Sequence, residues 1–284
     1  MKTAVRETLM RAVFFAAAFV SVAAVVLICV FLFFNGIPGM VKIGTWDFLS
    51  GTTWRPDDNI YGIFPMILGS IYVTAVALVI GVPSGIMCAV YMARFCPPVL
   101  YRFFKPAVDL LAGIPSVVYG FFGLMVIVPA VRSAFGGSGK SILAAGIVLG
   151  MMILPTVISV SETSVRAVPE SYYEGSLALG ATRERSVFSV VVPAAGSGIL
   201  SSVVLGMGRA VGETMAVYMV AGNQPVIPES IVKGVRTLTT NIVVEMGEAA
   251  DLHREALIAT GVVLFVFIML INLLFSFLKR RALK

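Results

Sequence analysis

Residues Glu174–Pro193 read EGSLALGATRERSVFSVVVP, and they lie between two long apolar runs of the chain. The stretch carries several charged side chains, which are costly to place in the hydrocarbon core of a bilayer. We therefore interpret it as part of a water-facing loop, over residues 162–193, that connects two spans of a membrane protein.

The residues in and before this stretch predict two short helices joined by a glycine. Pro169 suits the first turn of a helix, where its missing N–H is not needed. Gly180 suits the left-handed C-cap, and Thr182 suits the N-cap of a second helix that ends before Pro193. Such an elbow presents a rigid knob to water; the alternative is an amphipathic surface loop without a partner. The knob bears Tyr172, Tyr173, Glu174 and Leu177.

The composition of the whole chain is that of a polytopic membrane protein. Of its 284 residues, 58% are hydrophobic and only 13% are charged, too few for the surface of a soluble domain of this size. A helix that spans a bilayer needs about 20 mostly apolar residues. Six segments meet this requirement, so we expect an all-α protein with six transmembrane helices. They are Val13–Phe34, Pro65–Met92, Pro106–Val131, Ser141–Ser161, Ala194–Gly222 and Ala256–Leu278.

The distribution of basic residues predicts the orientation of these spans. If residues 1–12 form a cytoplasmic N-terminus before a transmembrane domain over residues 13–284, thirteen Lys and Arg residues lie inside and seven outside. This bias predicts that both termini and Glu174 are cytoplasmic, whereas Trp54, Gly137 and His253 face outward. It also accounts for the net charge of +6 without a nucleic-acid partner.

Several features that can signal other chemistry do not do so in this chain. The three cysteines, Cys29, Cys88 and Cys96, have no paired spacing, so we expect no disulfide framework. The only histidine, His253, has no cysteine near it, so we expect no metal centre. Ala134–Ser141 reads AFGGSGKS, which fits a relaxed phosphate-loop pattern. It links two spans on the outward side, so a glycine-rich turn is the better interpretation.

The outward loop Asn35–Gly62 holds both tryptophans of the chain. Trp46 and Trp54 lie near the ends of spans, where amphipathic indole rings favour the membrane–water interface. We therefore favour interfacial anchoring for both. The alternative is that Trp54 belongs to a motif, FLSGTTWRP over Phe48–Pro56.

The fifth expected span carries the charges that most suggest function. It reads GMGRAVGETMAVYMVAGN over Gly206–Asn223, and a continuous helix would place Arg209 and Glu213 on one face within ion-pair reach. Charged residues at membrane depth usually face the bundle interior or a water-filled path, so we expect a pathway role. The alternative is a structural ion pair that locks two helices. Gly208 and Gly212 form a G-x-x-x-G pattern, which predicts close approach of a neighbouring helix.

The third expected span contains AGIPSVVYGFFGL, Ala112–Leu124. Pro115 interrupts the backbone hydrogen bonds there, and the Ser116 hydroxyl can replace one of them. Gly113, Gly120 and Gly123 allow close helix packing.

The Glu174 loop resembles the EAA loop of ABC-transporter permeases. Gly180 follows Glu174 at the family's spacing, and a Val-x-Val-Pro block closes the loop at Pro193. Glu-Gly-Ser stands where the family name implies Glu-Ala-Ala, and the substituted residues are equally small. The resemblance implies a type I ABC importer permease fold without its own ATP site or cofactor. It also implies that a cytoplasmic ATPase docks on Tyr172, Tyr173, Glu174, Gly175, Leu177 and Gly180.

Four further motifs resemble phosphate permeases, and two of them, GETMAVYMVAGN and TLTTNIVVEMGEA, resemble the C-type subunit in particular. The other two are FLSGTTWRP and IPSVVYG. The resemblance implies import of inorganic phosphate across the cytoplasmic membrane of a prokaryote. It implies a heterodimer with an A-type permease, two cytoplasmic ATP-binding subunits and an extracytoplasmic phosphate-binding protein, with membrane lipid around the spans.

In that mechanism Arg209 meets the anion, since a guanidinium matches phosphate oxygens in a bidentate manner. Glu213 then neutralises Arg209 when phosphate is absent, and Thr214 and Ser116 offer hydroxyls along the pathway. Three alternatives stay open. The first is a permease for sulfate, molybdate or phosphonate. An intramembrane enzyme and a self-sufficient channel are the others, although the spans contain no nucleophile–base pair.

Overall fold

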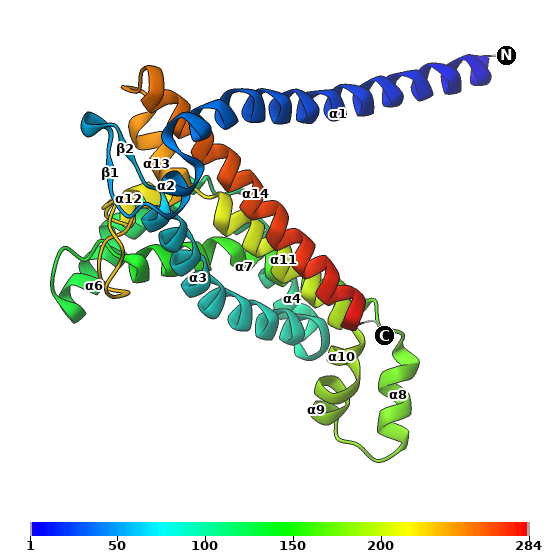
Figure 1. Cartoon of the computed structure of the whole chain (residues 1–284). Coiled ribbons are helices and arrows are strands. Elements are labelled where there is room, and N and C mark those ends of the chain that lie inside the picture. Colours follow the sequence, from blue (N-terminus) through cyan, green and yellow to red (C-terminus); the bar gives the residue numbers. More distant parts are fainter. Residues whose placement is uncertain (1, 283–284) are drawn as a thin grey trace.

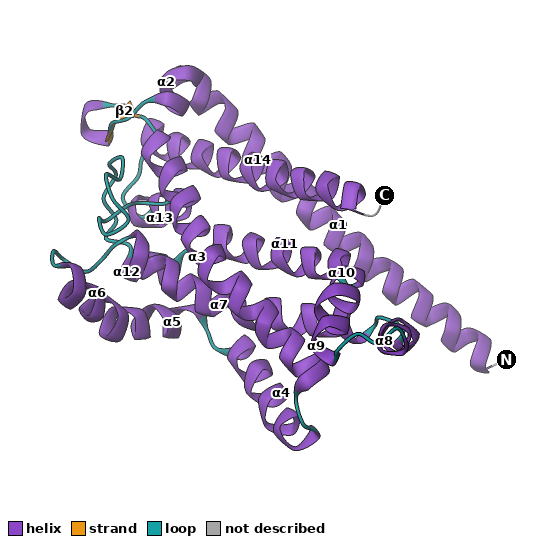
Figure 2. Ribbon diagram, turned by 90° about the horizontal axis from the view of Figure 1, so that it is seen from below, coloured by secondary structure: helices purple, strands orange, loops and turns teal. Residues whose placement is uncertain are grey.

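The computed structural model describes residues 2–282, and helices make up almost all of this part of the chain (Figures 1 and 2). Lys284, one of the basic residues counted on the inside, lies outside the described residues. The helices are α1 (Lys2–Ile43), α2 (Thr45–Ser50), α3 (Phe64–Val90), α4 (Pro98–Gly113), α5 (Ser116–Phe122), α6 (Val128–Phe135), α7 (Ile142–Arg166), α8 (Glu170–Ala178), α9 (Arg183–Ser186), α10 (Val192–Ala194), α11 (Gly196–Gly212), α12 (Met215–Val220), α13 (Leu238–Glu245) and α14 (Asp251–Ala282).

Wider π-helical turns and one small hairpin complete the described secondary structure. The π turns extend α3, connect α5 to α6 and connect α9 to α10. In the hairpin, β1 (Trp54–Arg55) pairs antiparallel with β2 (Ile60–Tyr61). The all-α expectation is confirmed.

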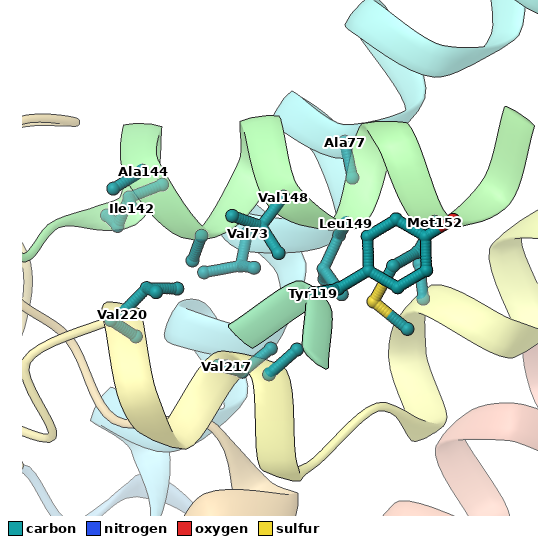
Figure 3. Close-up of a cluster of buried hydrophobic side chains, with 14 of the residues drawn as sticks. Val73, Ala77, Tyr119, Ile142, Ala144, Val148, Leu149, Met152, Val217 and Val220 are labelled. Carbon is teal, nitrogen blue, oxygen red and sulfur yellow. The ribbon is translucent and has the colours of Figure 1, made fainter. Parts of the chain in front are cut away.

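The core of the bundle surrounds α7. Gly146 of α7 lies so close to Val76 of α3 that an added Cβ would collide with it, and Gly206 of α11 packs tightly, though less closely, against Val157 of α7. Small residues let helices approach in this way where lipid, rather than water, surrounds them. Figure 3 shows the resulting cluster, to which α3, α5, α7 and α12 contribute. Its members include Val73, Ala77, Tyr119, Val148, Leu149, Met152, Val217 and Val220.

Within residues 2–282, five helical segments are long and apolar enough to cross a membrane, which confirms a multi-pass membrane protein. A sixth meets the same test only as a pair of helices, Arg183–Ala194 and Gly196–Gly212, which are bent by 68° at their junction. The five segments are Leu9–Ile43, Phe64–Phe95, Ser116–Phe135, Ile142–Arg166 and Asp251–Phe275.

Two of the expected spans are interrupted, so their expected bounds are wrong. The third does not run from Pro106 to Val131, because α4 ends at Gly113 and α5 begins only at Ser116. Pro115 has no N–H to continue the ladder and forces Ile114 into an extended conformation, with ψ of 126°.

The fifth expected span, Ala194–Gly222, is interrupted in the same way. Helix α11 ends at Gly212, Glu213 is extended with ψ of 132°, and α12 begins at Met215. The first span is longer than expected, because α1 continues to Ile43 instead of ending before Asn35. Gly36 lies against Val262 of α14, which holds this last part of α1 in the bundle.

The predicted outward loops and the predicted cytoplasmic loop over residues 162–193 lie at opposite ends of the bundle (Figure 1). The hairpin, α6 and α13 gather at one end, whereas α8, α9 and the end of α14 lie at the other. The AFGGSGKS stretch is the turn between α6 and α7, with Gly136, Gly137 and Gly139 all at positive φ. Ser141 then caps α7 by accepting from the N–H of Ala144, so the glycine-rich turn is confirmed.

Candidate functional sites

Arg209 and Glu213 do not form the predicted ion pair. Because α11 ends at Gly212, Glu213 leaves the helix and its side chain turns to the next one. Its Oε1 accepts a hydrogen bond from the N–H of Ala216 at 3.1 Å, in the first turn of α12. The carboxylate therefore compensates the positive end of α12 rather than the guanidinium.

The two interrupted spans pack against each other at their breaks. Gly120 of α5 meets Ala216 of α12, and Gly123, one turn later, meets Val220. Both sets of contacts advance in the same direction along the chain, so α5 and α12 run parallel and begin within about one helical turn of each other. Ser116 and Thr214 are the residues at those beginnings, and both are half-buried. The structure thus brings the predicted pathway hydroxyls to two neighbouring helix starts. The predicted close packing is present at Gly120 and Gly123, whereas a Cβ added at Gly113 would have no atom of a neighbouring element within 4 Å.

Arg209 is half-buried in the last turn of α11, next to this junction. Among the hydrogen bonds and ion pairs that residues 2–282 form, none involves its guanidinium. Gly208 and Gly212 on either side of it have no atom of the chain within 4 Å of an added Cβ. The close neighbour that the G-x-x-x-G pattern predicts is therefore not within the described part of this chain, and the surface beside Arg209 is open.

The predicted elbow of two helices joined by Gly180 is confirmed. Gly180 has φ of 86°, and its N–H bonds to the carbonyl of Leu177 while the N–H of Ala181 bonds to that of Ser176. This pair of bonds is the Schellman C-cap that a glycine favours. Thr182 then accepts from the N–H of Arg185 at 3.3 Å and caps α9. The second helix does not end before Pro193 as expected, because the helical path continues through a π turn into α10.

Helix α8 displays most of the predicted surface residues to solvent. Tyr172 is 53% exposed and Leu177 38%, and Glu174 and Gly175 are exposed as well. Tyr173 is half-buried against the elbow's own core. The most exposed apolar side chain here is Leu179, at 91%, which the sequence analysis did not single out.

Arg94, in the π turn that extends α3, holds this elbow to the bundle. Its guanidinium bonds to Glu170 at 2.6 Å and reaches the carbonyls of Val165 and Val168. It also lies 5.8 Å from the ring centroid of Tyr173. The partners are more than 70 residues away in sequence, so no local pattern indicates the contact.

At the opposite end, Trp54 is an internal residue and its predicted role as an interfacial anchor is wrong. It is 5% exposed, and its Nε1 donates to Glu245 at 2.7 Å. Glu245 also contacts Arg236 and, at 2.9 Å, His253. This cluster fixes the hairpin to α13 and α14, as the motif alternative allowed. Trp46 is 77% exposed, and its anchoring stays a prediction. Within the described residues no set of metal-ligating side chains gathers.

The fold is that of type I ABC importer permeases. One similar solved structure is a bacterial ABC transporter involved in the import of the acidic polysaccharide alginate. It matches with a TM-score of 0.60 and 12% identity, over 94% of this chain and 96% of the other.

Sequence comparison then gives the family. Residues 81–284 match the family described as binding-protein-dependent transport system inner membrane component, and the chain belongs to this family. A probable ABC transporter permease protein, YqgH of Bacillus subtilis, is 41% identical over 95% of this chain and 90% of its own length. The phosphate transport system permease protein PstC of Mesorhizobium japonicum is 34% identical, over 88% of this chain and 84% of its own length.

Proposed function

We propose that the chain is one permease subunit of an ATP-driven importer of inorganic phosphate. Several relatives at 31–34% identity are phosphate transport system permease proteins. The observation that carries the proposal is the half-buried Arg209, which has no compensating carboxylate and adjoins the junction of two interrupted spans. An uncompensated guanidinium in a membrane protein is stable where it has water or an anion to bind.

In this proposal Arg209 binds phosphate oxygens through its planar fork of N–H donors. Ser116 and Thr214 offer hydroxyls from the starts of α5 and α12. Glu213 differs from its expected role, because it caps α12 and so fixes the break beside Arg209. Its carboxylate then remains outside the bound anion's shell, and Arg209 keeps its full charge for the substrate.

The second permease completes the pathway by packing on the open surface that carries Gly208, Arg209 and Gly212. A cytoplasmic ATPase docks on the exposed face of α8, where Tyr172, Glu174 and Leu177 are accessible. The phosphate-binding protein approaches the opposite end, beside the hairpin and α13. Both termini lie in the cytoplasm in this arrangement.

Transport with competing anions tests the cargo. The permease is reconstituted in liposomes with its partner permease, ATPase and binding protein, and uptake of labelled phosphate is measured with ATP inside. We expect ATP-dependent uptake that unlabelled phosphate suppresses and that equal sulfate, molybdate or phosphonate leaves unchanged. If labelled phosphate is not taken up and labelled sulfate, molybdate or phosphonate is, the proposal transfers to that anion. Uptake without ATP would indicate a channel.

A further inference from the structure

The cytoplasmic end of α7 contains a buried carboxylate that the transport pathway does not use. Glu162 has a side chain that is only 3% exposed. It accepts hydrogen bonds from the Tyr101 hydroxyl at 2.7 Å and from Nε of Arg166 at 2.8 Å, and Nζ of Lys105 lies 3.4 Å away. A buried charge needs such partners, because it loses the solvation of water.

These contacts attach α4 to α7. Tyr101 and Lys105 both belong to α4, whereas Arg166 also donates to the carbonyl of Met92 at 2.8 Å and stacks 4.5 Å from the Tyr101 ring. The hydrogen bond to Glu162 and burial raise the pKa of the Tyr101 phenol, which therefore stays protonated as a donor at neutral pH.

Few apolar contacts fix the position of α4. Val108 is its one buried side chain, and Phe104 makes an edge contact with Tyr91 at 6.4 Å between ring centroids. Val99, Phe103 and Leu110 are each about 70% exposed. The helix is amphipathic and lies outside the candidate spans. The polar contacts of the Glu162 cluster therefore form a large part of its attachment to α7.

The two ends of α4 face the two functional regions of the chain. Near its beginning, Arg166 is one helical turn after Glu162 and four residues before Glu170, which Arg94 binds in the elbow. Near its end, the carbonyl of Leu111 accepts a hydrogen bond from Tyr119 of α5 at 2.9 Å. Tyr119 in turn belongs to the same buried cluster as Ala210, which follows Arg209 in α11.

We propose that Glu162 is a positioning residue that transmits movement of the α8 elbow to α4, and through Tyr119 to the start of α5 beside Arg209. This inference rests on the proposed function, because it assumes that an ATPase moves the elbow. The carboxylate keeps α4 and the end of α7 together during that movement. Without the Glu162 carboxylate, movement of the elbow reaches the start of α5 only in part.

The test compares Glu162→Gln and Tyr101→Phe in the reconstituted complex. Glutamine keeps an acceptor for Tyr101 but removes the charge that holds Arg166 and Lys105, and phenylalanine removes one donor with little change of shape. We expect the number of phosphate ions imported per ATP hydrolysed to fall about tenfold in the first variant and about threefold in the second. Co-purification of the ATPase and its hydrolysis rate without binding protein should be unchanged.

Asp109→Asn is the matched control, since Asp109 is 57% exposed and contacts only the other side of Lys105. Its transport ratio should equal that of the wild type. Wild-type ratios of phosphate imported per ATP hydrolysed in both test variants would overturn the proposal. So would a lower ratio in Glu162→Gln alone, if that variant also yields less folded protein. If the wild-type complex imports a different oxyanion, the cargo proposal fails, and the same ratio measured with that anion still tests Glu162.

Discussion

The charged residues of the chain show what a sequence reveals about single positions. Arg209 and Glu213 stand out in an apolar run, and both lie at the junction of the interrupted spans as expected of functional charges. The predicted ion pair between them is wrong, because it requires a continuous helix. Helix α11 ends at a position that tertiary contacts hold. Thr239 donates a hydrogen bond to the carbonyl of Glu213 at 3.0 Å, and Gly120 packs on Ala216.

The contacts of Arg94 and Glu162 were not predicted from the sequence, for a different reason. Each is one of several charges near the predicted cytoplasmic ends of spans. Glu170, the ion-pair partner of Arg94, is 76 residues away, and Tyr101, which donates to Glu162, is 61 residues away. A single sequence contains no record of such pairs. A glutamate at the inner end of an otherwise apolar helix was the one available signal for Glu162.

Gly180 supports the sharpest prediction about a single residue. Gly180→Val places a β-branched side chain at φ of 86°, which costs about 1–2 kcal/mol of backbone strain. A Cβ added at this position would meet no other atom within 4 Å, so the strain comes from the backbone alone. The strain should distort the Schellman cap and the elbow. We expect normal membrane insertion, and several-fold lower ATPase co-purification and phosphate uptake, measured on the affinity-purified complex.

Gly137→Val is the matched control for this change. Gly137 has φ of 72° and equally open surroundings, but it lies in the turn between α6 and α7 at the other end of the bundle. It should retain the ATPase. Wild-type ATPase co-purification with Gly180→Val would argue against docking on the elbow.

At the scale of elements, helix caps were easier to predict than helix breaks. Gly180 and Thr182 determine the ends of α8 and α9 through their own backbone and hydroxyl, so local sequence was sufficient. Hydropathy cannot locate a break inside an apolar run, because residues on both sides are equally apolar. Pro115 was the visible signal for one break, whereas Gly212 and Glu213 gave none that differed from a continuous helix.

The elbow and the two interrupted spans lie in different parts of the bundle. The starts of α5 and α12 are neighbours, whereas α8 projects from the far end of the bundle (Figure 1). Helix α4 contacts α7 through the hydrogen bond from Tyr101 to Glu162, and it contacts α5 through the carbonyl of Leu111, which accepts from Tyr119. Pro115 indicated the break between α4 and α5, although the third expected span was drawn through both helices.

At the scale of the whole molecule, the orientation in the membrane is the broadest expectation. We expect Glu174 to be cytoplasmic and Trp54, Gly137 and His253 to face outward. The bias of Lys and Arg supports this, and the contact between Trp54 and His253 places them at one end. Because Trp54 and His253 are partly buried, single cysteines at 137 and 174 are the better probes.

The labelling uses a background without the three native cysteines and a membrane-impermeant maleimide on intact cells. Cysteine at 137 should react at once, and cysteine at 174 should react only after the membrane is opened. Reaction at 174 in intact cells would reverse the proposed orientation and remove the cytoplasmic ATPase from the elbow.

The central claim is that Arg209 binds the transported anion. In the reconstituted complex, Arg209→Gln should lower phosphate uptake roughly 10- to 100-fold through loss of charge-assisted hydrogen bonds, while the assembled complex stays at its normal level. Arg209→Lys should recover only part of the uptake, because an ammonium lacks the planar fork. Glu213→Gln should be milder, since a neutral oxygen can still cap α12.

The decisive measurement is phosphate uptake, with the level of assembled complex, for Arg209→Gln, Glu213→Gln and the double variant. The account predicts that the double variant is as inactive as Arg209→Gln, because nothing replaces the guanidinium. If Arg209 and Glu213 only lock helices together, each single change leaves a costly unpaired charge and the double change removes it. Recovery of both uptake and complex level in the double variant would contradict the account.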